Sequence, residues 1–97
     1  RSAPAGGRDE DLGDAILTPG LVNAHTHLDL TVLRGFLGGL GFFDWVRTLT
    51  RAVATLDEQD LIASATLGVA EGLAGGVTTF ADTAPNDAAF VAMRALG

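Results

Sequence analysis

The sequence has no cysteine and no lysine, and both absences limit what the chain can bind. Without cysteine there is neither a disulfide nor a thiolate metal site. The basic residues are six arginines against twelve acidic residues, so the formal net charge is −6 and no basic patch is expected. Nucleic acid and anionic membranes require such a patch to neutralise phosphate. We therefore expect neither as a partner and expect a small molecule instead.

Long apolar runs and signal-like segments are absent too, so a cytoplasmic location is the expectation, with a signal peptide upstream of these residues left open. Hydrophobic residues still make up 47% of the chain and charged residues 19%, which is typical of a folded protein. The chain has 97 residues and opens on Arg1 rather than on methionine. We expect a piece of a longer protein, with little independent core.

Local patterns predict the first elements. Residues 1–14 are rich in Gly, Ala and acids and show no periodicity, which predicts a loop or a frayed strand edge. A short apolar strand is expected to begin near Leu21 and to run into His25. The glycines of residues 29–41 predict a mobile loop. Apolar residues at three- and four-residue steps then predict an amphipathic helix over residues 43–54, with its apolar stripe packed inward.

The second half of the chain predicts helix, strand and helix. Asp57 is a suitable cap for the first of these helices, and the glycine pair at 75–76 should end it. The β-branched run at 77–81 predicts a strand, and residues 85–87 should open the last helix. The buried face of the middle helix is predicted to be Leu61, Ile62, Ala65, Val69 and Leu73, and the last helix carries Phe90, Val91 and Leu96. This alternation indicates a parallel α/β protein.

The chain's two histidines fall together at the predicted strand end. Side chains alternate along a strand, so His25 and His27 should point the same way, roughly 6.5 to 7 Å apart along the backbone. Two imidazoles so placed supply part of a metal's ligands. In the ordinary alternative, one histidine caps the strand and the other is a core residue. Ligands and catalytic groups gather at this edge of parallel α/β folds, and that favours metal.

The segment PGLVNAHTHL resembles the first barrel strand of the amidohydrolase superfamily, whose His-x-His pair ligates a catalytic divalent metal. Further blocks resemble that family in order and spacing, at residues 33–35, 44–46, 71–73 and 75–82. The resemblance covers residues 16 to about 84. It implies that residues 16–97 are the first two βα units of a (β/α)₈ TIM barrel, and that residues 1–15 are a loop or the last strand of a small β-domain.

Within the superfamily, the residues around the histidine pair, Asn23 and Leu28, resemble those of the branch of deaminases and chlorohydrolases. Similar members of that branch are the guanine, S-adenosylhomocysteine and aminodeoxyfutalosine deaminases. The resemblance implies one zinc or iron ion on His25 and His27, with further ligands and the proton-transfer groups beyond Gly97. It implies hydrolysis of a C–N bond other than a peptide bond: water activated by the metal attacks an electron-poor ring carbon of a purine, pyrimidine or nucleoside, and ammonia leaves. Some members bind ribose hydroxyls through a glutamate before the second helix, and residues 50–54 contain no carboxylate.

Three further residues are candidates for substrate binding, each with an ordinary alternative. Trp45 is expected to wall the pocket, although a tryptophan on an apolar stripe is often core. Arg34 is expected to contact a polar or anionic group, or else to be solvated. Asp82 ends a strand on the expected active face, where an aspartate also commonly caps the next turn. Asp29 lies close to the expected ligands, without an assigned role.

Two other functions stay open. A binuclear cyclic-amide hydrolase would bridge its metals with a carboxylated lysine from a later strand. A catalytically inactive piece would bind metal loosely through its two histidines and expose unpaired strand edges. The formation of a homo-oligomer is left open as well.

Overall fold

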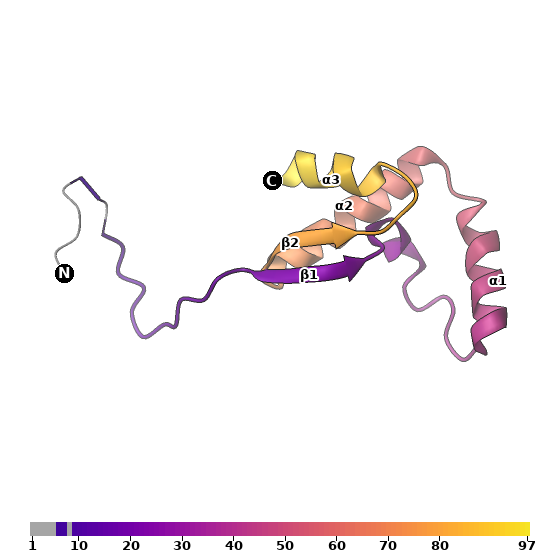
Figure 1. Cartoon of the computed structure of the whole chain (residues 1–97), viewed down its shortest axis with the longest axis horizontal. Coiled ribbons are helices and arrows are strands. Elements are labelled where there is room, and N and C mark those ends of the chain that lie inside the picture. The colour runs from indigo at the N-terminus through magenta and orange to yellow at the C-terminus, as the bar shows by residue number, and fades with distance from the viewer. Residues whose placement is uncertain (1–5, 8) are drawn as a thin grey trace.

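The computed structural model describes residues 6–7 and 9–97, so the part of the predicted N-terminal loop at residues 1–5 and 8 lies outside the described residues. Residues 9–20 contain no helix or strand and extend away from the rest of the chain (Figure 1). Residues 9–14 therefore have no regular secondary structure, and their assignment to a loop or to the remnant of a β-domain stays a prediction. Of the helices in the described residues, none has the length and apolar character needed to cross a bilayer.

Strands β1 (Leu21–Thr26) and β2 (Val77–Asp82) form a two-stranded parallel sheet (Figure 1). Leu21 pairs with Val77 at one end and Thr26 with Asp82 at the other. The two strands therefore end at the same edge, as parallel pairing requires. This confirms the predicted parallel α/β arrangement for the described residues.

Helix α2 (Glu58–Ala74) begins and ends where its sequence predicts. The Asp57 side chain accepts from the Asp60 backbone N–H at 2.9 Å, and the Asp60 carboxylate accepts from the Asp57 N–H at 3.1 Å. This reciprocal pair satisfies two donors that the first helical turn leaves free. Gly75 caps the other end, and Gly76 turns the chain toward β2 with a φ of 85° that suits glycine.

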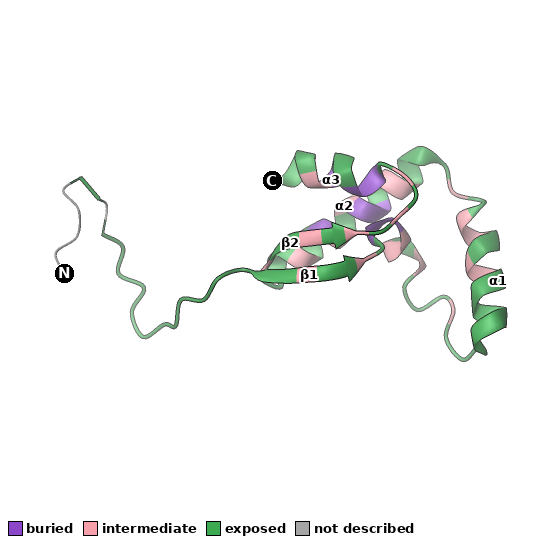
Figure 2. Cartoon of the chain, viewed as in Figure 1, coloured by how far each residue is buried: buried purple, intermediate pink, exposed green. Residues whose placement is uncertain are grey.

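The core lies where α2 meets α3 (Ala88–Leu96) and the 3₁₀ helix η1 (Leu28–Leu33), as the buried colour in Figure 2 shows. Its buried apolar members are Leu28, Ala65, Val69, Ala88, Ala89 and Ala92. The predicted α2 face is correct except for Leu73, which is exposed. Helix α3 packs through its alanines and the partly buried Met93, which lets it approach α2 closely, while Phe90, Val91 and Leu96 are exposed.

The predicted loop at residues 29–41 is wrong in its first part, which η1 occupies. The Thr31 hydroxyl donates to the Leu28 carbonyl at 2.8 Å. The Val32 backbone N–H donates to the buried Ser64 hydroxyl on α2 at 2.9 Å. The second bond ties η1 to α2, and only residues 34–41 remain irregular.

Helix α1 (Phe42–Val53) forms as predicted, but its apolar stripe is not buried. On this stripe Phe42 is 69% exposed, whereas Leu49 and Val53 are only half-buried, and α1 stands apart from the sheet and from α2 and α3 (Figures 1 and 2). The inward packing predicted for this stripe is therefore wrong within the described residues. Leu30 and Leu33 of η1 face Trp45 and Leu49 of α1 only across an open hollow, so this contact leaves the stripe largely uncovered.

Candidate functional site

The carboxyl end of β1 presents both histidines on one side. His25 lies in the strand and His27 directly follows it, and their rings stand edge to face with centroids 5.3 Å apart and an interplanar angle of 80°. Both residues are exposed, so neither is a core histidine within the described chain. The Asn23 side-chain oxygen accepts from the His25 backbone N–H at 3.3 Å. The two imidazoles thus lie side by side, as the alternation of side chains along a strand predicts, and their role as metal ligands stays a prediction.

The pair fits a divalent ion as two of its ligands. Neutral imidazole nitrogen is a preferred ligand for zinc and for iron, and two rings this close can coordinate one metal ion. Among the described residues, no three His, Asp or Glu side chains gather into a group that could hold a metal. A complete coordination shell therefore needs donors from outside the described residues.

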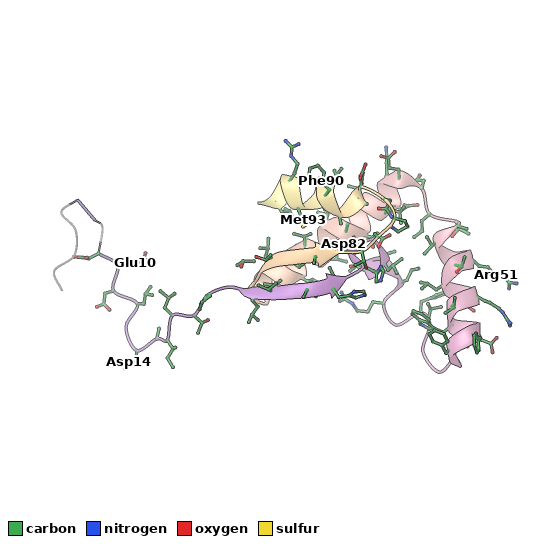
Figure 3. The ribbon with its side chains drawn as sticks, in the orientation of Figure 1. Glu10, Asp14, Arg51, Asp82, Phe90 and Met93 are labelled. Atoms are coloured by element: carbon green, nitrogen blue, oxygen red, sulfur yellow. The ribbon has the colours of Figure 1, made fainter. Side chains whose placement is uncertain are left out.

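Asp82 lies at the carboxyl end of β2, where β1 also ends (Figure 3). One carboxylate oxygen accepts from the Leu28 backbone N–H at 2.8 Å and the other from the Ala84 N–H at 2.9 Å. The second bond is the turn cap that the sequence offered as the alternative role for Asp82. The first reaches across to the residue that follows His27.

Thr83 and Asn86 join this edge, although the sequence did not single them out. The Thr83 hydroxyl lies 3.2 Å from His27 Nε2 and 3.4 Å from its Nδ1. The Asn86 side-chain amide donates to buried Asp29 at 2.8 Å. Both contacts span more than 50 residues of sequence, so no local pattern could have revealed them.

Arg34 and Trp45 line one hollow of about 340 Å³ beside η1, so the structure brings together two of the predicted substrate-binding residues. Arg34 also forms a two-pronged ion pair with Glu71 of α2, at 3.0 and 2.5 Å. These hydrogen bonds lower the pKa of the Glu71 carboxyl and raise that of Arg34. The pair anchors the start of the irregular segment at residues 34–41 to α2.

Comparison with known proteins matches residues 16–96 to the amidohydrolase family. A 5-methylthioadenosine/S-adenosylhomocysteine deaminase of Symbiobacterium thermophilum is 38% identical over 80% of the chain, and one of Nitratidesulfovibrio vulgaris is 44% identical over 84%. The 5-methylthioadenosine/S-adenosylhomocysteine deaminase 2 of Archaeoglobus fulgidus is 39% identical over 74%. The aligned residues make up only 18%, 19% and 17% of these relatives' own lengths. No solved structure matches the chain significantly.

Proposed function

The chain belongs to the amidohydrolase family, and on that premise we propose that the protein containing it is a metal-dependent hydrolase that deaminates a purine, pyrimidine or nucleoside-like small molecule. Water would replace the amino group on an electron-poor ring carbon, and the nitrogen would leave as ammonia. The similarity to relatives named as deaminases supports this reaction.

One observation of the structure carries the proposal: His25 and His27 converge at the carboxyl end of β1. In this role each imidazole gives one nitrogen to the ion, and exposure leaves both rings accessible. Zinc is the proposed ion, with iron as the alternative. When bound, such an ion lowers the pKa of a coordinated water to about 7, so that hydroxide is available at neutral pH.

The position of the two histidines in the fold supports the proposed site. We propose that β1 and β2 are the first two strands of a (β/α)₈ barrel that residues 16–97 begin. We propose that residues up to 15 are a loop or the remnant of a small β-domain before it. Active sites of such barrels lie at the carboxyl ends of the strands. His25 and His27 lie at that end of β1, as the proposal requires.

The substrate side of the site is proposed to include Arg34 and Trp45. They line the same hollow, so a ring stacked on the indole would lie within reach of the hollow's one cationic side chain. Asp82 was the third sequence candidate for substrate. Both of its carboxylate oxygens already accept backbone N–H groups, which leaves less of it free for a ligand.

The test is metal analysis and ammonia release on the intact protein. Its first substrates should be 5-methylthioadenosine and S-adenosylhomocysteine, for which the relatives are named, with guanine as a third. We expect a chelator to abolish turnover and zinc or iron to restore it. The His25→Ala and His27→Ala variants should lose both metal and turnover, and Thr79→Ala, an exposed position on β2, should keep both. Full activity in metal-free protein would refute the proposal.

A further inference from the structure

The end of β2 holds the peptide on both sides of His27. Asp82 accepts from the Leu28 backbone N–H at 2.8 Å, immediately after the histidine. The Thr83 backbone N–H donates to the Thr26 carbonyl at 2.9 Å, immediately before it. The backbone that carries the imidazole is thus tied to the neighbouring strand end at two successive points.

The side chain of Thr83 adds a contact with the ring itself. Its hydroxyl oxygen lies within hydrogen-bonding distance of the Thr26 carbonyl at 3.2 Å and of His27 Nε2, also at 3.2 Å. Since Thr26 offers a carbonyl, the hydroxyl hydrogen is directed there, and its oxygen faces the imidazole. Thr83 therefore restricts how the ring rotates about the bonds that join it to the strand.

We propose that Asp82 and Thr83 are positioning residues for His27: they fix the direction in which its imidazole leaves the sheet, and so prepare it to bind the metal. The inference rests on the proposed function, because it requires His27 to be a ligand. Asp82 acts through the backbone, since its two oxygens are both used on N–H groups. Outer groups that orient a ligating histidine typically change metal affinity by about 10- to 100-fold.

Two conservative variants test this in the intact protein. Asp82→Asn keeps the size of the side chain but leaves one oxygen for two backbone donors, and Thr83→Val removes only the hydroxyl. The matched control is Asp57→Ala, which also deletes an aspartate that accepts a backbone N–H, but at the start of α2. The measurements are the dissociation constant for Zn²⁺ in competition with a chromophoric chelator, the visible spectrum of the Co²⁺ form, and the thermal unfolding midpoint.

Asp82→Asn and Thr83→Val should each weaken Zn²⁺ binding by about tenfold or more and alter the Co²⁺ spectrum. Asp57→Ala should lower the unfolding midpoint and leave both metal measurements unchanged. If His27→Ala loses the metal while both positioning variants bind it as the wild type does, the inference is wrong and the proposed function stands. If His27→Ala keeps wild-type affinity, the proposed function itself fails, and the inference with it.

Discussion

The ring of Phe80 on β2 rests against Gly72 on α2, so closely that a β-carbon on residue 72 would lie 2.4 Å from Cζ of the ring. No real carbon atoms approach so closely without a shift of one of them. The same ring packs against the buried core cluster, so moving it aside would disturb those contacts. Gly72 therefore sets how near α2 lies to the sheet.

Gly72→Ala should lower the free energy of unfolding. Overpacking a filled contact costs about 1 to 3 kcal/mol, and the better helix propensity of alanine returns about 1 kcal/mol. We expect a net loss of about 1 kcal/mol in urea unfolding of the intact protein. Gly38→Ala is the control, because its β-carbon would meet nothing within 4 Å. A Gly72→Ala protein as stable as the Gly38→Ala protein would contradict this packing.

Asp57→Ala should destabilise the start of α2. The variant removes the acceptor for the Asp60 N–H and, with it, half of the reciprocal cap. Loss of such a cap typically costs about 1 kcal/mol, and Asp57→Ser, which restores an acceptor, should recover most of it. Thermal unfolding of the three proteins measures both effects. Equal midpoints for the alanine and serine variants would show that the cap does not hold the helix end.

Glu71→Gln should lower stability at neutral pH and much less in acid. Arg34 lowers the pKa of the Glu71 carboxyl. The ion pair therefore stabilises the fold fully at pH values above 4.5, the ordinary pKa of glutamate, and this stabilisation is lost as the pH falls through the lowered pKa. Both side chains are largely exposed, so salt should shrink the difference too. Unfolding midpoints of both proteins between pH 7 and about 3 test the sign.

The control for this pair is Asp44→Asn, which breaks a longer, single-pronged and more exposed pair with Arg47 at 3.3 Å. It should change stability less than Glu71→Gln does. If the difference in unfolding midpoint between the wild type and Glu71→Gln stays constant down to pH 3, the effect has a cause other than charge.

The sequence predicted elements whose causes are local. The capping aspartate and the paired glycines set the ends of α2, and the His-x-His spacing places both imidazoles on one side of the sheet. Each of these follows from neighbours within a few residues. The same holds for the β-branched run that forms β2.

The features that the sequence did not predict depend on contacts between residues far apart in the sequence. The 3₁₀ turn of η1 is held by Ser64, which lies 32 residues beyond the N–H of Val32. Helix α3 packs through alanines, whose small apolar surface gives a weak signal beside Phe90. The stripe of α1 has the right period to be buried, but periodicity does not say which surface covers it.

Asn86→Asp should destabilise the fold through Asp29. That residue is only 3% exposed, its Oδ1 has no partner among the described residues, and its Oδ2 accepts from the Asn86 amide. The variant removes this donor and keeps the oxygen that accepts from the Ala88 N–H at 3.0 Å. A buried polar group left without its partner lowers the free energy of unfolding by about 1 to 3 kcal/mol, and by more when the group is charged. Repulsion between the two carboxylates at residues 29 and 86 would add to this loss.

A double-mutant cycle separates this contact from a general effect on the loop. Asp29→Leu replaces the buried carboxylate with an apolar group of similar size, so no acceptor remains for residue 86 to satisfy. In that background Asn86→Asp should cost little, and the two changes together should cost less than the sum of each alone. Urea unfolding of the four proteins gives the coupling energy. If Asn86→Asp costs the same with and without the Asp29 carboxylate, the contact between them is not what stabilises this edge.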